Sequence, residues 1–389
     1  MKKGLLALAF GGLSIGMTEF TMMGILPDIA GDIGVNIPVA AHLIALYALG
    51  VFVGAPVLVL FTSKYPPKKV LILLMLMFFV FNGLFAIAPT HWSMQLTRFM
   101  SGLPHGAFFG VGSVVAAKMA PKGKEAQYIS IMFTGMTIAN LLGVPLGTFL
   151  GHHYSWRITY GIICFLGLGT ALSIFFWLPN IASNNSENIF SQLSYFKRPE
   201  AWLLIVLISV GTGGLFAWIS YIAPLVTNVS GIAAGKVPFI MILVGLGMCF
   251  GNLLGGKLAD SISPTKAAMI CFSSMAVCLV VVYFTSPIEW TAYPMAFITG
   301  LISFTIGAPI QIMLIRTAEG AETLAAAAGQ ASFNMGNTLG AYLGGIPITL
   351  GFAYNTPLLV GSGMAIMGVM LTYTFYKTIV LKKYKHLTR

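Results

Sequence analysis

One acidic residue, Glu19, lies well inside a long apolar run near the start of the chain. The run extends from about residue 4 to residue 27. An ionised carboxylate is costly in hydrocarbon, so a residue of this kind faces a water-filled cavity, pairs with a cation or binds a proton. Glu19 is therefore the first candidate for carrying protons. Permanent pairing with an arginine is the alternative.

Arg98 and His105 lie in another apolar run, at residues 94–118. At about 1.5 Å rise per residue, Glu19 lies about two turns and Arg98 about one turn from the same membrane surface. Arg98 is thus the natural partner of Glu19, and a proton reaching Glu19 would break the pair and bias a carrier between two openings. Alternatively, Arg98 extends to the interface. His105 is either a group that titrates near neutral pH or binds a polar substrate, or a packed neutral ring.

Further polar side chains in the apolar runs are candidates for lining a substrate cavity, because a polar group inside a membrane must face protein or water. They are Tyr47, Asn140, Asn252, Gln311, Asn334 and Asn337. Which of them line the cavity is left open.

The elements that position these residues follow from composition. Of 389 residues, 57% are hydrophobic and 8% are charged, whereas a soluble domain carries roughly 25% charged residues. Because a membrane-crossing helix needs about 20 apolar residues, the sequence predicts an all-α integral membrane protein of twelve transmembrane helices. The predicted spans are 4–27, 38–62, 70–89, 94–118, 126–150, 158–178, 200–226, 236–258, 266–285, 291–315, 324–349 and 357–377.

Charge distribution predicts the orientation. Of the 21 Lys and Arg residues, all except Arg98, Arg157 and Lys236 fall on one side of these spans, which the positive-inside rule assigns to the cytoplasm. Both termini are then cytoplasmic, in a bacterial inner membrane. The N-terminal apolar run is expected to be retained as the first helix.

The two halves match at a constant shift of 197 residues. Gly50 and Gly54 correspond to Gly247 and Gly251, and further Gly, Pro, Lys and Asn pairs share the register. Paired six-helix halves are a transporter architecture. We expect a six-helix bundle at 1–178, a cytoplasmic linker at 179–199 and a second bundle with a basic tail at 200–389.

Three strings carry a family resemblance. The chain reads Gly-Met-Thr-Glu-Phe-Thr-Met-Met-Gly-Ile-Leu-Pro-Asp-Ile-Ala-Gly-Asp at 16–32, Arg-Phe-Met-Ser-Gly at 98–102, and Gly-Met-Thr-Ile-Ala-Asn-Leu-Leu-Gly-Val-Pro-Leu-Gly at 135–147. They resemble the major facilitator superfamily, and within it the drug:proton antiporter group. The resemblance covers essentially the whole chain and implies two pseudo-symmetric bundles, alternating access and proton-coupled efflux.

The same resemblance implies a gating motif formed by Gly135, Gly143, Pro145 and Gly147, a segment that bends and seals against the second half. It also implies a charged loop motif, of which Lys64 and Asp260 remain. The sequence departs from the family where Ser63 stands at the position of the loop aspartate, and where Val144 separates Gly143 from Pro145.

The function predicted is proton-coupled export of a small organic solute. A sugar or sugar derivative is favoured, and a drug or nucleoside is possible. Proton-coupled uptake and an uncoupled facilitator are the alternatives. No Gly-x-x-x-x-Gly-Lys-Ser/Thr string is present, so an ion gradient rather than a nucleotide is the expected energy source.

Other classes fit less well. An intramembrane enzyme would need paired catalytic groups, and a receptor would not need the repeat. We expect no cofactor, no metal at His152 and His153, and no nucleic-acid partner. The partners expected are the solute, protons and the lipid bilayer, with the chain working as a monomer. The four cysteines lie in apolar runs without metal-ligand spacing.

Overall fold

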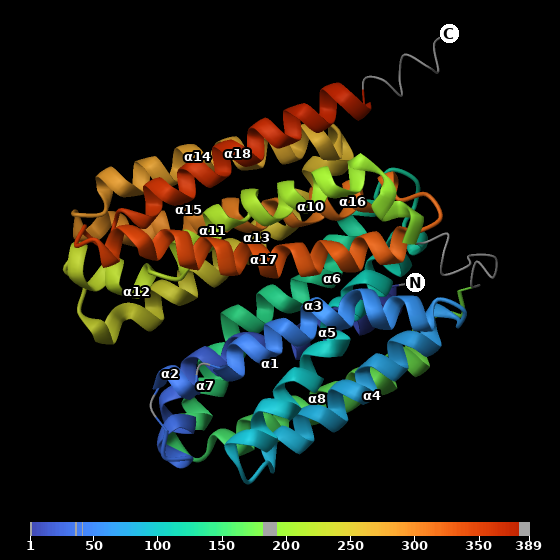
Figure 1. Ribbon diagram of the computed structural model, residues 1–389, viewed down its shortest axis with the longest axis horizontal. Coiled ribbons are helices and arrows are strands. Elements are labelled where there is room, and N and C mark those ends of the chain that lie inside the picture. The colour runs from blue at the N-terminus through green and yellow to red at the C-terminus, as the bar shows by residue number, and fades with distance from the viewer. Residues whose placement is uncertain (1, 36, 41, 182–192, 381–389) are drawn as a thin grey trace. The chain divides into compact units, whose positions relative to one another are not determined.

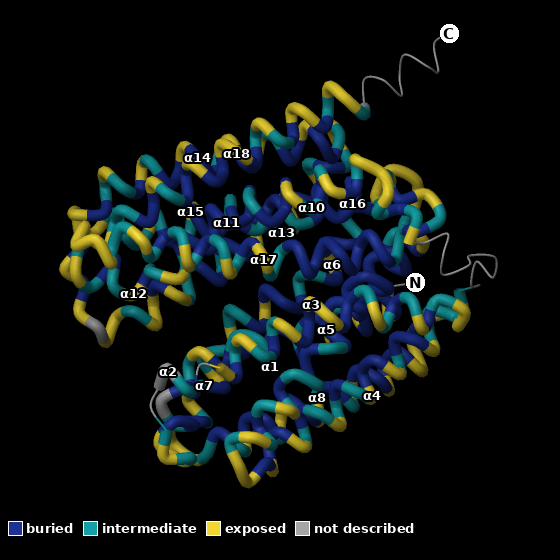
Figure 2. The backbone as a smooth tube through the Cα atoms, viewed as in Figure 1, coloured by how far each residue is buried: buried dark blue, intermediate teal, exposed yellow. Residues whose placement is uncertain are grey.

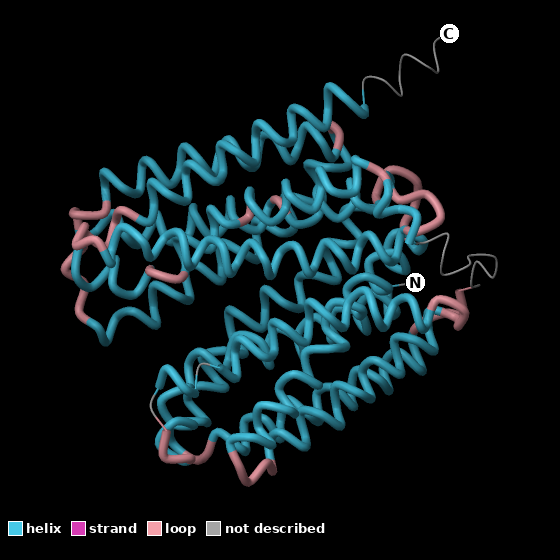
Figure 3. Tube along the Cα trace, viewed as in Figure 1, coloured by secondary structure: helices cyan, strands magenta, loops and turns pink. Residues whose placement is uncertain are grey.

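The computed structural model describes residues 2–35, 37–40, 42–181 and 193–380, and within these ranges the chain is helical with short connections and no strand (Figures 1 and 3). The first half contains α1 (Lys2–Asp32), α2 (Ile37–Ala40), α3 (His42–Thr62), α4 (Pro67–Ala86), α5 (His91–Met119), α6 (Glu125–Ile138), α7 (Val144–His153) and α8 (Trp156–Trp177).

The second half is more segmented. It contains α10 (Pro199–Gly211), α11 (Gly213–Ile219), α12 (Ile222–Pro224), α13 (Val237–Ser261), α14 (Pro264–Thr285), α15 (Ala292–Thr305), α16 (Gly307–Thr317), α17 (Glu322–Thr349) and α18 (Pro357–Phe375). Short 3₁₀ and π turns join several of them.

Twelve membrane crossings result. Among the described residues, eleven helices or joined helices are long and apolar enough to span a bilayer. The twelfth is α17, which has 28 residues but carries several amides and hydroxyls along its length. The predicted all-α fold of twelve transmembrane helices is confirmed, and most predicted spans agree with the helices to within a few residues.

The chain divides into two compact units. One comprises residues 1–193 and 320–331, and the other comprises residues 194–319 and 332–389. The start of α17 thus groups with the first unit. Most of the predicted linker lies outside the described residues, as do the last nine residues of the predicted basic tail, so the predicted boundaries stay a prediction.

Corresponding helix pairs pack together in both halves. In the first, α3 packs on α5 and α4 packs on α8; in the second, α13 packs on α15 and α14 packs on α18. Within each unit, exposed positions alternate with buried ones along the outer helices (Figure 2). Large apolar side chains such as Phe61 and Phe165 are exposed there, as expected of helices whose solvent is lipid.

Glycine lets the paired helices touch backbone to backbone. A methyl group added at Gly50 would overlap the carbonyl oxygen of Phe99, and one at Gly251 would overlap the carbonyl oxygen of Leu301. Small residues at transmembrane helix contacts permit this approach. The predicted small faces therefore form the α3–α5 and α13–α15 contacts.

We predict that Gly251→Ala lowers the free energy of unfolding by about 1–3 kcal/mol, the usual cost of overpacking, because the neighbouring backbone cannot move aside. Thermal unfolding of detergent-purified protein would measure this. The matched control is Gly169→Ala, since no atom lies within 4 Å of a methyl group added there. Equal melting temperatures for the two variants would contradict the close-packed contact.

Candidate functional site

Arg98 lies fully buried in the first unit, with none of its surface exposed. Its helix, α5, begins at a capping box in which the Thr90 side chain and Ser93 bond each other's backbone N–H. The Arg98 guanidinium donates to the Thr18 carbonyl at 3.4 Å, to the Thr18 hydroxyl at 3.1 Å and to the Leu43 carbonyl at 3.4 Å. The guanidinium is thus held between α1 and α3.

Three aromatic rings enclose the same guanidinium. The ring centres of Tyr47, Phe85 and Tyr160 lie 4.3, 5.4 and 5.6 Å from its central carbon. The Tyr160 hydroxyl also donates to the Thr18 carbonyl, at 3.3 Å. Ring faces attract a cation, most strongly where water is excluded. Arg98 is therefore an interior cation, and the alternative that it extends to the membrane interface does not match its burial.

Glu19 follows Thr18 on α1 and is partly exposed. The charge of Arg98 acts on its carboxyl group. Among the described residues, however, no ion pair of 4.0 Å or less joins the two. The expected partners are neighbours, but the donors of Arg98 are directed to Thr18 and Leu43 rather than to Glu19.

His105 lies on α5 and is almost fully buried. Its Nδ1 and the Tyr47 hydroxyl are hydrogen-bonded at 3.1 Å, and its ring lies 5.4 Å from that of Phe109. Tyr47 therefore contacts Arg98 with its ring face and His105 with its hydroxyl. The structure brings together four of the predicted site residues: Glu19, Tyr47, Arg98 and His105.

Sequence reasoning missed three members of this cluster. The Thr18 hydroxyl donates to Asn82 Oδ1 at 2.6 Å, and Asn82 Nδ2 donates to the Phe78 carbonyl at 2.9 Å. Tyr160 is the third. Asn82 left a signal that could have been used, because it is the only amide in the otherwise apolar interior of α4. Thr18 and Tyr160 left none, since their types are common in membrane helices. We call Thr18, Glu19, Tyr47, Asn82, Arg98, His105 and Tyr160 the polar cluster.

The second half carries no copy of the polar cluster. The 197-residue shift matches Thr18 with Leu215, Tyr47 with Val244 and Asn82 with Leu279. For α5 and α15 the register follows from equivalent contacts. Methyl groups added at Gly102 and Gly300 would meet the carbonyl oxygens of Tyr47 and Val244, which already correspond, so Gly102 corresponds to Gly300. These helices are therefore offset by 198 residues, and Arg98 corresponds to Ala296. All four counterparts belong to one apolar core of the second unit.

The predicted gating glycines face inward. Methyl groups at Gly135, Gly143 and Gly147 would meet Ala9, Met17 and Thr21 of α1. The glycine face is therefore a contact within the first unit, and the role of this segment in sealing against the second half stays a prediction. A π turn at Ala139–Gly143 stands just before Pro145. Such turns accommodate a break in helical hydrogen bonding, and this one marks where the helix departs from regular geometry.

The remaining candidates are dispersed. Asn140 lies in that π turn and donates to the Met136 carbonyl at 3.2 Å. Asn252 and Gln311 are buried on α13 and α16. The last two candidates are half-buried on α17: Asn334 and Asn337. Lys64 is exposed after α3, whereas Asp260 is half-buried near the end of α13. These residues belong to two units, so their role as one cavity or one loop latch stays a prediction.

Polar contacts tie the end of α1 to α7 and α8. The His152 ring Nδ1 is hydrogen-bonded to the Asp28 carboxylate, 2.7 Å from its nearer oxygen, and Asp32 forms an ion pair with Arg157 at 3.2 Å. Arg157 also donates to the carbonyls of Ala86 and Ala88, at 3.1 and 2.9 Å. No group of three or more metal-ligating side chains occurs among the described residues. The acidic partner of His152 is Asp28 on α1, which is distant in the sequence and was not predicted.

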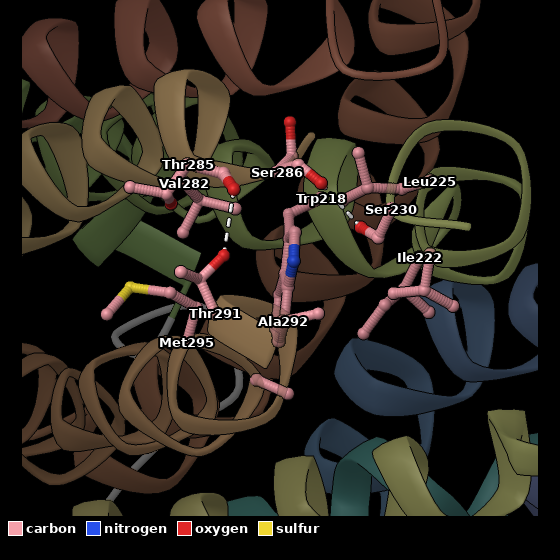
Figure 4. A pocket seen from close by; sticks show the side chains of 12 residues that line it. Trp218, Ile222, Leu225, Ser230, Val282, Thr285, Ser286, Thr291, Ala292 and Met295 are labelled. Carbon is pink, nitrogen blue, oxygen red and sulfur yellow. Dashed lines mark hydrogen bonds between the residues drawn. The ribbon is translucent and has the colours of Figure 1, made fainter. Parts of the chain in front are cut away.

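A small cavity of about 20 Å³ lies in the second unit between α11–α12, α14 and α15. Figure 4 shows the Trp218 ring in it, between Met295 on one side and Ser230 on the other. Ala296 and Val282 line it, at the positions that correspond to Arg98 and Phe85. A space of this size holds one water molecule rather than a transported solute.

We predict that Tyr47→Phe lowers the free energy of unfolding by about 0.5–1 kcal/mol, because it removes the hydrogen bond to His105 but keeps the ring over Arg98. Tyr47→Leu should cost about 1–2 kcal/mol more, since the cation then loses its nearest ring. Unfolding in mixed detergent micelles measures both. If the two variants were equally stable, the ring would contribute nothing to holding Arg98.

The fold and the buried polar cluster are those of a membrane transporter. The model of the Major Facilitator Superfamily matches residues 8–345. The chain belongs to this superfamily, whose members transport solutes and are not enzymes.

Relatives and a solved structure agree with this assignment. AraJ of Escherichia coli (strain K12), which is named as a transporter, is 40% identical, with 97% of this chain and 96% of AraJ covered. A Pasteurella multocida (strain Pm70) protein named as a sugar efflux transporter is 28% identical over 97% of this chain and 92% of its own length. The Escherichia coli fucose:proton symporter FucP shares the fold, with a TM-score of 0.77 at 13% identity, covering 95% of this chain and 98% of FucP.

Proposed function

We propose that this transporter exports a small organic solute in exchange for protons, and that a sugar or sugar derivative is the solute. Glu19 is the proton-binding group, Arg98 is the cation that responds to its charge, and His105 is the second polar group of the pathway. The chain lies in the bacterial inner membrane with both termini in the cytoplasm, where the basic loops favour them.

The observation that carries the proposal is the one-sided polar cluster. Thr18, Tyr47, Asn82 and Arg98 have apolar counterparts that pack the same helices in the second half. Packing therefore does not require polar residues at these positions. A buried cation with a neighbouring carboxyl is costly to keep in a membrane, and such groups in membrane helices mark ion and proton pathways.

Sugar is favoured for two reasons. One relative is named as a sugar efflux transporter. The predicted cavity residues also include several amides, and amides both donate and accept hydrogen bonds, as binding of hydroxyl groups requires. Export is favoured by that relative's name and by the resemblance of residues 135–147 to the gating motif of the drug:proton antiporter group. Proton-coupled uptake is the alternative, because a carboxyl that binds and releases protons serves either direction.

We predict that Glu19→Gln abolishes proton movement evoked by substrate, because an amide is similar in shape but cannot bind or release a proton in this pH range. The purified protein would be placed in liposomes containing a pH-sensitive dye. A proton gradient would be imposed and a panel of sugars, nucleosides and lipophilic cations added. Wild-type flux that disappears in Glu19→Gln supports the proposal.

The other outcomes are also decisive. Flux that persists in Glu19→Gln would move the proton site elsewhere, with His105→Gln as the next variant to test. Solute movement without proton flux in the wild type would overturn the exchange mechanism and leave a facilitator. The sign of the flux separates export from uptake: protons moving opposite to the solute indicate exchange, and protons moving with the solute indicate a symporter.

A further inference from the structure

The hydrogen bonds around Thr18 have a fixed direction. Its hydroxyl has one hydrogen, which it donates to Asn82 Oδ1 at 2.6 Å. The oxygen of the same hydroxyl accepts from Arg98 Nη1 at 3.1 Å. Arginine has donors only, so this series of hydrogen bonds runs from Arg98 through Thr18 to Asn82, and the bond from Arg98 cannot reverse its direction.

Asn82 is itself fixed. Its Nδ2 donates to the Phe78 carbonyl one turn earlier on α4, at 2.9 Å. This bond identifies which end of the amide is the nitrogen and leaves the oxygen facing Thr18. The residue is completely buried, so water does not compete for the amide oxygen.

We propose that Asn82 is a positioning residue of the proton-coupling site. By accepting the Thr18 hydrogen, Asn82 holds the Thr18 oxygen as an acceptor for Arg98 and so keeps the guanidinium from pairing directly with Glu19. This inference rests on the proposed function, in which Glu19 binds the proton. It adds a hydrogen-bonding residue on α4, which otherwise contributes the Phe85 ring to the site.

Without Asn82 the Thr18 hydroxyl would lose its acceptor. Its hydrogen would then turn toward a carbonyl of its own helix, as threonine hydroxyls in helices do, and the lone pair that faces Arg98 would move away. The charged and titratable groups around the guanidinium are Tyr47 on α3, Tyr160 on α8 and Glu19 on α1. Glu19 is the carboxyl among these, so it is the acceptor that the N–H freed from the Thr18 hydroxyl would take, while the Thr18 and Leu43 carbonyls keep their bonds.

A structural duty alone does not account for Asn82. Leu279 stands at its position in the second half and packs in an apolar core with Leu215 and Ala296, the counterparts of Thr18 and Arg98. Leucine is therefore compatible with this place in the helix packing. The second half has Ala296 in place of the arginine, so it needs no amide to orient a hydroxyl toward a guanidinium.

The test measures the protonation of Glu19 directly and does not depend on transport. The infrared carbonyl band of the protonated carboxyl, identified by its loss in Glu19→Gln, would be titrated in the purified full-length protein. For Asn82→Leu we expect the midpoint to fall by about one pH unit, a shift typical of a newly formed pair between a carboxylate and an arginine. Thr18→Val should give the same shift, and the double variant should add nothing further.

Two controls separate positioning from packing. Thr18→Ser keeps the hydroxyl and should retain the wild-type midpoint. Cys164→Ala removes another hydrogen bond to α4, from Sγ to the Phe79 carbonyl at 3.2 Å, and should also leave the midpoint unchanged. If Asn82→Leu does not fold, Thr18→Val tests the same series of hydrogen bonds by removing the hydroxyl that joins Asn82 to Arg98.

A midpoint that stays at the wild-type value in folded Asn82→Leu or Thr18→Val would overturn the inference. A shift as large in Cys164→Ala as in Asn82→Leu would do so too, because it would reflect packing alone. The proposed function can fail separately. If the midpoint shifts as expected but the wild type shows no substrate-evoked proton flux, the positioning role stands and proton-coupled transport does not.

Discussion

Burying the charge of Arg98 is the constraint on which the first unit depends. Arginine at the centre of a membrane helix costs at least about 2.5–3.5 kcal/mol, so the surrounding helices must supply acceptors and ring faces. α1 supplies the Thr18 carbonyl and hydroxyl, α3 the Leu43 carbonyl and the Tyr47 ring, and α8 the Tyr160 ring. α3 can do so because Gly50 and Gly102 let it approach α5 backbone to backbone.

The second half keeps this scaffold and omits the charge. Gly247 and Gly300 reproduce the close contact at α13 and α15, while Ala296 replaces Arg98 and the polar neighbours become apolar. Where the large side chains Arg98 and Phe85 have the smaller counterparts Ala296 and Val282, a cavity of about 20 Å³ lies beside Trp218. The comparison of the two halves therefore separates two features: the glycine contacts recur in both halves and serve the fold, whereas the counterparts of Thr18, Tyr47, Asn82 and Arg98 are apolar, so packing alone does not require the polar cluster.

The sequence was sufficient for the helices because each crossing is long and apolar, a property of local composition. The ionisable members of the polar cluster could be predicted for the same reason, since Glu19, Arg98 and His105 are conspicuous in hydrocarbon. Their partners could not. The hydrogen bond between Thr18 and Asn82 joins residues 64 positions apart, and it depends on the rotation of α1 and α4 about their axes, which composition does not specify. The contact of Gly135, Gly143 and Gly147 with α1 could not be predicted for the same reason, since a face of small residues fits any neighbouring helix.

The arrangement of Glu19 and Arg98 suits a group that must change its charge. A carboxylate locked in a direct, bidentate pair with arginine is stabilised in its ionised form and resists protonation, whereas a carboxylate without a nearby cation pays the full cost of ionisation in a poorly hydrated site. Here the cation is near enough to act on Glu19, but its hydrogen bonds go to the Thr18 oxygens and the Leu43 carbonyl. Neither charge state of Glu19 then leaves Arg98 without acceptors. In the proposed mechanism the carboxyl gains or loses a proton while the cation keeps these acceptors, so a solute and a proton gradient can decide between the two states.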